Sequence, residues 1–116
     1  MYDNGAVFGV VASAWRSTLF ALVLAQGQTA DLERILDSIQ QSIEAGDLDR
    51  ALLSVSRELN RRPNEAGLLN LRGVIYAKQQ RLDVARADFQ RAVQLDSNLT
   101  PAWQNLARSC QFLASA

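Results

Sequence analysis

The stretch QRLDVARADFQRAV, residues 80–93, decides the fold, because GDLDRALLSVSREL, residues 46–59, shows the same pattern 34 residues earlier. In both stretches a Leu-Asp pair follows a short break, and an alanine and a large apolar residue then recur at the spacing of a helix. A fixed period of roughly 20 to 50 residues is typical of stacked units, each of which buries its apolar face against the next. The pattern therefore predicts a helical repeat protein.

The same step of 34 residues extends the match on both sides of these stretches. It aligns Ile35, Leu69 and Trp103 at apolar positions, and it aligns Asn64 with Asn98 in two turns. Agreement at apolar and turn positions alike indicates a repeated packing unit rather than a chance match. The predicted units cover residues 32–65, 66–99 and 100–116, and the last holds only the first helix of a further unit.

The second unit resembles the tetratricopeptide repeat, whose unit of about 34 residues is a helical hairpin with fixed aromatic, glycine and alanine positions. The first unit departs from this pattern, with Ser38, Ile39 and Ser42 where Leu, Gly and Tyr are expected. The resemblance implies an all-α solenoid of two helix pairs and a C-terminal closing helix, preceded by an N-terminal apolar segment. The signature residues are Leu69, Gly73, Tyr76, Ala85, Phe89 and Ala92, with Trp103 and Leu106 in the third unit.

Short breaks separate the two predicted helices of each unit, and an aspartate follows each break. We expect Asp49 and Asp83 to cap the second helices by accepting backbone N–H bonds. Gly73 lies inside a predicted helix, where glycine costs about 0.8–1 kcal/mol relative to alanine. The resemblance implies that this glycine lets the second helix approach closely through Ala85.

Trp103 and Cys110 are two residues for which a functional role can be weighed against a role in packing. Trp103 lies at an apolar position of the repeat, so we expect a core residue rather than a platform for a ligand. Cys110 has no activating neighbour in the sequence, so we expect a buried filler rather than a reactive thiol.

Residues 1–30 carry the pattern of an export signal. Arg16 precedes the apolar run STLFALVLA, residues 17–25, and small residues follow, so cleavage after Ala25 fits best. The alternatives are a membrane anchor over residues 6–25, with Arg16 near the middle of the bilayer, and an apolar helix lying on the end of the repeat domain. Cleavage implies a periplasmic or secreted protein, and retention implies an inner-membrane anchor.

Composition excludes several classes of function. With 12 Lys plus Arg and 12 Asp plus Glu, the formal net charge is zero and offers no attraction to nucleic acid. The chain has no histidine and a single cysteine, Cys110, so neither an internal disulfide nor a His/Cys metal site can form. No phosphate-binding loop or nucleophile with a base is present. We therefore expect no enzyme, catalytic residue, metal, cofactor, nucleic-acid partner or small-molecule substrate.

The resemblance implies binding of an extended peptide or a helix on the concave surface formed by the first helix of each unit. We expect a non-catalytic protein-interaction module in the bacterial cell envelope, with a protein or peptide partner. A self-associating assembly subunit and a membrane-tethered adaptor that retains residues 6–25 are the alternatives. Asn70, Lys78, Asn105 and Arg108 suggest only part of the carboxylate clamp found in some members of the family. By register, the lining residues are Gln40, Ile43, Glu44, Asn70, Val74, Ala77, Lys78, Gln104, Arg108 and Gln111.

Overall fold

The structure is a computed structural model that describes residues 29–115. The predicted export signal and the alternative membrane anchor over residues 6–25 lie outside the described residues, apart from the last two residues of the 1–30 segment. Contacts divide the chain into two units, Met1–Ile35 and Leu36–Ala116. The described part of the first unit, residues 29–35, is helical and holds an exposed ion pair of 3.8 Å between Arg34 and Asp31. The second unit contains α2 to α5.

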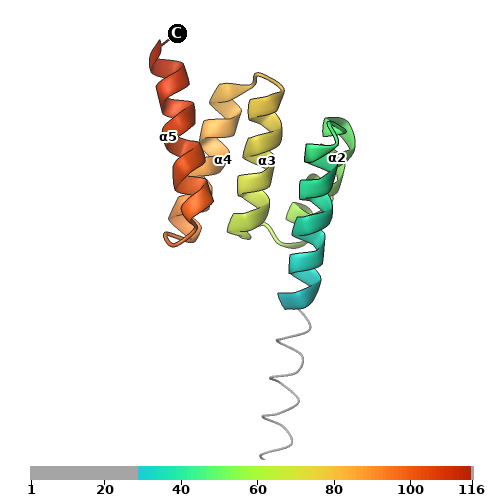
Figure 1. Ribbon diagram of the computed structural model, residues 1–116. Coiled ribbons are helices and arrows are strands. Elements are labelled where there is room, and N and C mark those ends of the chain that lie inside the picture. The colour runs from blue at the N-terminus through green and yellow to red at the C-terminus, as the bar shows by residue number, and fades with distance from the viewer. Residues whose placement is uncertain (1–28, 116) are drawn as a thin grey trace, which may run out of the picture. The chain divides into compact units, whose positions relative to one another are not determined.

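The described residues form helices joined by short turns, with no strand in residues 29–115. The prediction of an all-α chain is confirmed. None of the described helices is long and apolar enough to cross a bilayer. After a helix over residues 29–44 the elements are α2 (Leu48–Arg61), α3 (Ala66–Lys78), α4 (Leu82–Leu95) and α5 (Thr100–Ser115) (Figure 1).

The two turns inside the helix pairs share a backbone conformation 34 residues apart. Gly46 has a φ of 81° and Gln80 has a φ of 64°, and both lie in the left-handed region that reverses the chain after a helix. Glycine adopts this conformation without steric cost, whereas Gln80 carries a side chain into it. The repeat therefore extends to the geometry of its turns.

The helix starts differ from the predicted caps. The side chain of Asp47 accepts a bond from the backbone N–H of Arg50 at 3.4 Å, and α4 begins after Arg81 without a side-chain cap. Asp49 and Asp83 lie inside the first turns instead, because Leu48 and Leu82 are already helical. Their negative charges still favour the helix dipole there. The prediction that these two aspartates are caps was wrong.

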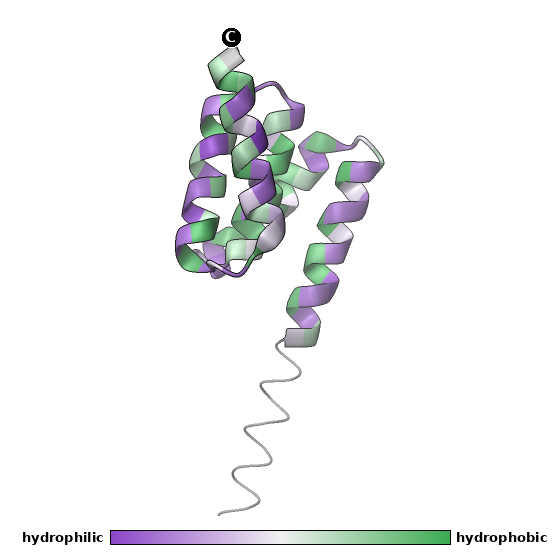
Figure 2. Cartoon of the chain, turned by 60° about the vertical axis from the view of Figure 1, so that its left-hand side comes forward, coloured by the Kyte–Doolittle hydropathy of each residue, from purple (hydrophilic) through white to green (hydrophobic). Residues whose placement is uncertain are grey.

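α2 and α4 each bury one apolar stripe, and α3 buries most of its residues because it contacts α2, α4 and α5. The stripe of α2 contains Ala51, Val55 and Leu59, and the corresponding stripe of α4 contains Ala85, Phe89 and Val93. Figure 2 shows hydrophobic and hydrophilic residues alternating along the helices, as in amphipathic helices. Full burial of a Val, Leu or Phe side chain in such a stripe stabilises the fold by about 1.5–3 kcal/mol.

Gly73 allows a side chain of α4 to pack closely on the backbone of α3. A Cβ built on this residue would lie 2.5 Å from Cε1 and 2.7 Å from Cδ1 of Phe89. The ring of Phe89, which is almost fully buried, thus packs directly on the backbone of α3. The three atoms nearest to such a Cβ all belong to this ring, whereas the resemblance implied an approach through Ala85, which is fully buried in α4.

Trp103 and Cys110 do not lie in the core, which contradicts the prediction for both. Trp103 is 48% exposed, and its indole N–H donates to the carbonyl oxygen of Ser97 at 2.9 Å. Cys110 is also exposed. The reason is that, among α2 to α5, their helix, α5, packs on α4 and touches α3 but does not contact α2. Among the remaining signature residues, Leu69, Ala85, Phe89 and Ala92 are buried, and Tyr76 and Leu106 are half-buried.

Candidate functional site

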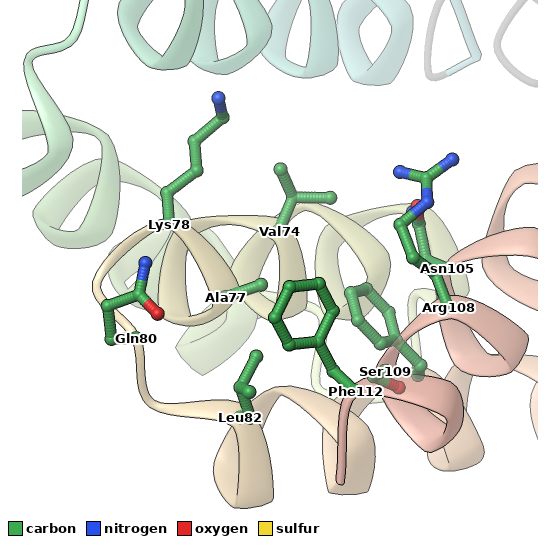
Figure 3. A pocket seen from close by; sticks show the side chains of 10 residues that line it. Val74, Ala77, Lys78, Gln80, Leu82, Asn105, Arg108, Ser109 and Phe112 are labelled. Carbon is green, nitrogen blue, oxygen red and sulfur yellow. The ribbon is translucent and has the colours of Figure 1, made fainter. Parts of the chain in front are cut away.

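A cleft of about 250 Å³ opens between α3, α4 and α5, and we call it the α3–α5 cleft (Figure 3). Most of its wall is apolar, and two cationic side chains stand at its rim. Its lining residues are Val74, Ala77 and Lys78 from α3, Gln80 from the turn, Leu82 and Phe89 from α4, and Asn105, Arg108, Ser109 and Phe112 from α5.

The repeat pattern itself produces the apolar wall of the cleft. Phe89 lies on Gly73 and presents its ring to the cleft from α4, while Ala77 leaves space one turn further along α3. Leu82 is the first residue of α4 and follows the left-handed turn at Gln80. In Figure 3, Phe112 points from α5 towards Val74 and Ala77. Its side chain is 59% exposed, so this wall remains open to solvent.

Lys78 and Arg108 supply the positive charge of the cleft. Both side chains are exposed, and within residues 29–115 neither forms an ion pair or a hydrogen bond. In Figure 3 they stand at opposite ends of the cleft, and both cationic groups point to the same side as Val74, away from Leu82 and Phe112. The lining contains no carboxylate. The cleft therefore has an apolar floor and an uncompensated positive rim.

An amide pair connects α5 to α3 beside the cleft. The Nδ2 group of Asn105 donates to Oδ1 of Asn70 at 3.0 Å, and Asn70 is 9% exposed. On α5 the hydroxyl of Ser109 donates to the carbonyl oxygen of Leu106 at 2.8 Å. The Oδ1 atom of Asn105 and the lone pairs of Ser109 remain as acceptors. This pairing orients α5 against α3 and leaves hydrogen-bonding capacity at the cleft.

Arg72 differs from the rim cations because its charge is already paired. Its Nε and Nη2 atoms donate to the two carboxylate oxygens of Asp88, each at 2.8 Å. The hydrogen bond with Asp88 raises the pKa of Arg72 above its ordinary value, against the opposing effect of burial. Its guanidinium also lies 5.9 Å from the ring centre of Tyr76, and Arg81 lies 4.6 Å from the same ring. Arg72 thus joins α3 to α4 and is not available to a partner.

The structure places only part of the predicted lining at the cleft. Val74, Ala77, Lys78 and Arg108 line it, as their register suggested. Ile43 is 2% exposed and belongs to the core, and the amide of Asn70 is engaged by Asn105.

Four predicted lining residues lie on the surface elsewhere. Gln40 and Glu44 are exposed on the helix over residues 29–44, where the amide of Gln40 donates to the carboxylate of Glu44 at 3.0 Å. Gln104 and Gln111 are exposed on α5, outside the lining of the cleft. The predicted lining residues are therefore divided between the cleft, the core and exposed positions of two helices.

Sequence reasoning missed several residues of the cleft. Leu82 and Phe89 were interpreted only as parts of the repeat, since their apolar character is explained by packing. The register of the repeat does not point to Ser109 or Phe112, although Phe112 follows Arg108 by four residues and thus shares its helix face. That spacing is the signal in the sequence that points to Phe112.

Metal chemistry has no candidate site in the described part of the chain. Residues 29–115 contain no group of three or more His, Cys, Asp or Glu residues that could hold a metal ion. The features that the structure does bring together are the apolar floor, the two cations and the amide pair of the α3–α5 cleft.

Comparison with known proteins agrees with the helical hairpin of α3 and α4. The family model described as tetratricopeptide repeat matches residues 66–99. The chain contains a tetratricopeptide repeat. Its matched residues begin with α3, include the Gly73 contact with Phe89, and end just before α5. The predicted resemblance to this family is confirmed.

A solved tetratricopeptide repeat structure shows the same fold. It is described as the second TPR of Spaghetti (RPAP3) bound to the HSP90 peptide SRMEEVD, and the alignment covers 70% of this chain and 75% of that chain. The TM-score is 0.64 at 23% sequence identity, a level at which the similarity concerns the fold. No protein with a curated description matches the sequence significantly.

Proposed function

We propose that this chain is a non-catalytic protein-interaction module that holds a peptide or a helical segment of a partner protein in the α3–α5 cleft. The observation that carries the proposal is the apolar cleft with two unpaired cations, Lys78 and Arg108, on a tetratricopeptide repeat. A preformed cleft on packed helices reduces the ordering cost that binding must overcome. The similar second TPR of Spaghetti is described as bound to a peptide, which supports the same mode here.

The size of the cleft supports a polypeptide partner rather than a small-molecule substrate. Pockets for small molecules usually measure about 300–1,000 Å³ and enclose most of their ligand. The α3–α5 cleft is smaller, at about 250 Å³, and is open along the exposed side of Phe112. Such a cleft suits one or two side chains of a longer segment.

Photocrosslinking tests the proposed function directly. A benzophenone amino acid in place of Phe112 should form crosslinks to a polypeptide in native extract, because this side chain lines the cleft. The matched control is the same substitution at Leu53 on α2, which is 63% exposed against 59% for Phe112 and lies outside the cleft. Equal crosslinking from both positions, or none from Phe112, would contradict the assignment.

The bacterial cell envelope is the proposed location, and the export pattern of residues 17–25 supports it. Mass spectrometry of the mature protein, isolated from its own cells, tests this part. A mature chain that begins at Gln26 supports export with cleavage after Ala25. A chain that keeps residues 6–25 and resists alkaline extraction from membranes supports the adaptor anchored in the inner membrane.

Self-association is a second candidate function, and the exposed apolar surface of α5 favours it. Trp103 is 48% exposed and Cys110 is exposed on the same helix. Such a surface can pack against another copy of the chain. Light scattering at increasing protein concentration separates the candidates, because a mass that rises with concentration supports an assembly subunit and a constant monomer mass excludes it.

A further inference from the structure

We infer that the α3–α5 cleft binds an internal peptide segment in which one large apolar side chain lies between acidic residues. The inference rests on the proposed function, because it names the class of segment that the same cleft takes. Three features carry it, namely the apolar floor, the position of the two cations and the acceptors beside them.

The floor of the cleft selects one apolar side chain. Val74 and Ala77 of α3, Leu82 and Phe89 of α4, and Phe112 of α5 line a space of about 250 Å³. Transfer of an apolar side chain from water into such a space is favourable in proportion to the area that it buries. A polar side chain would lose its hydration there without finding a matching set of partners.

The rim selects acidic residues on both sides of that apolar side chain. Lys78 and Arg108 stand at opposite ends of the cleft, with Ala77, Val74 and Phe112 between them (Figure 3). Neither cation has an ion-pair partner in the described part of the chain, and no carboxylate lines the cleft. The carboxylate of Asp88 is already held by Arg72. Charge complementarity therefore favours a partner that places a carboxylate at each end of the cleft.

The acceptors beside the cleft suit the backbone of a continuous segment. One N–H of Asn105 is used by Asn70, and its Oδ1 remains able to accept a backbone N–H. Ser109 donates its hydroxyl proton to Leu106, so its oxygen is also left as an acceptor. These groups can bind peptide amides, and side-chain carboxylates can reach the rim, so the segment needs no free terminal carboxylate.

Fluorescence anisotropy with a labelled nonapeptide of sequence GSEELEESG tests this inference. The peptide carries an acetylated N-terminus and an amidated C-terminus, so only its side chains are charged. We expect it to bind at least about tenfold more tightly than GSKKLKKSG and GSEESEESG, which reverse its charge and remove its apolar side chain. Binding should weaken as salt rises, because exposed pairs are screened.

Variants of the full chain connect the peptide to the two cations. Lys78→Glu and Arg108→Glu should each weaken binding of GSEELEESG about tenfold, and Phe112→Ala should weaken it through loss of the apolar wall. Arg86→Glu is the matched control, since Arg86 is an exposed cation of α4 outside the cleft. Circular dichroism should show the same helix content for all four variants.

The results separate this inference from the proposed function. Equal binding of the acidic and the basic peptide, or full binding by both reversal variants, overturns the inference. If crosslinking at Phe112 still captures a polypeptide, the proposed function stands and only the class of segment is wrong. If neither the peptides nor the crosslinks report binding, both the inference and the proposed function are wrong.

Discussion

α3 and α5 carry corresponding residues 34 positions apart, but among α2 to α5 the helix α3 contacts all three others, whereas α5 contacts α4 and α3 and not α2. Leu69 in α3 is 5% exposed, and its counterpart Trp103 in α5 is 48% exposed. The same position in the repeat is thus a core residue in one helix and a surface residue in the other. The repeat pattern specifies how a helix can pack, and the presence of a neighbour decides whether it does.

The glycine position shows the same difference between the two helices. Gly73 of α3 lies under the ring of Phe89, and Ala107, its counterpart in α5, is exposed. A glycine is required only where another side chain must reach the backbone. Alanine is the better helix former where no side chain needs that space.

The largest expected difference concerns the apolar position of the repeat. Leu69→Ala should lower the free energy of unfolding by about 2–5 kcal/mol, because it leaves a cavity in the core. Trp103→Ala should cost about 1–2 kcal/mol, mainly through the lost contact area and the lost hydrogen bond to Ser97. Urea unfolding followed by circular dichroism measures both. Equal losses would mean that α5 is covered as fully as α3.

The next difference is whether exchanging glycine and alanine raises or lowers the free energy of unfolding. Gly73→Ala should destabilise the chain by about 1–3 kcal/mol despite the better helix propensity of alanine, because the added Cβ overlaps the Phe89 ring. At position 107 the wild-type alanine should be the more stable residue, so Ala107→Gly should cost about 1 kcal/mol. A stabilised Gly73→Ala variant would refute the close contact, and the same urea titration reports it.

A smaller effect is expected at the ion pair between α3 and α4. Asp88→Ala should cost about 1–2 kcal/mol, because it leaves Arg72, with 29% of its side chain exposed, without its two hydrogen bonds. Asp31→Ala is the control, since it breaks a pair whose side chains are 80% and 63% exposed, and it should leave the thermal midpoint nearly unchanged.

The pH dependence of this ion pair follows from the raised pKa of Arg72 in the folded chain. A group with a raised folded-state pKa stabilises the fold fully below its unfolded pKa, and the contribution is lost as the pH rises through the folded value. The contribution of Arg72 should therefore stay constant through neutral pH and disappear only in strong alkali. A difference between wild type and Asp88→Ala that changes with pH between about 6 and 9 would contradict the assignment of the shift to this pair.

The smallest expected effect is at Cys110, the counterpart of Tyr76. Tyr76 is half-buried and lies under the guanidinium of Arg81, while Cys110 is exposed. Cys110→Ser should change the free energy of unfolding by less than about 0.5 kcal/mol. An aromatic disulfide reagent should label the thiol of the folded chain as fast as that of the unfolded chain. Strong protection of the thiol would show that another surface covers α5.

The helices could be predicted from the sequence because the 34-residue period records which faces pack together. It correctly indicated the α3–α4 hairpin and the special role of Gly73. The pattern aligns both Ala85 and Phe89 with the seam over Gly73, but it does not show that the ring of Phe89 comes nearest to the glycine. The exposure of Trp103 and Cys110 could not be predicted, because the pattern aligns them with Leu69 and Tyr76 of α3 but does not show how much of α5 is buried.

The cleft could be predicted only in part for a similar reason. Val74, Ala77, Lys78 and Arg108 follow from the register of the first helices. Ser109 and Phe112 line the cleft because α5 packs on α3 and α4. This arrangement depends on packing between one repeat and the next. The binding surface is thus a product of the contact between helices, whereas the helices themselves are a product of the repeat.

A double-mutant cycle between Gly73 and Phe89 tests most directly the claim that a neighbour determines how each repeat position is used. We predict that Gly73→Ala, which destabilises the wild-type chain, becomes neutral or stabilising in a Phe89→Ala background, where the ring is absent and helix propensity decides. The coupling measured by urea unfolding should then be about 1–3 kcal/mol. Free energies that add within about 0.3–0.5 kcal/mol would show that the two residues act independently and would contradict the account.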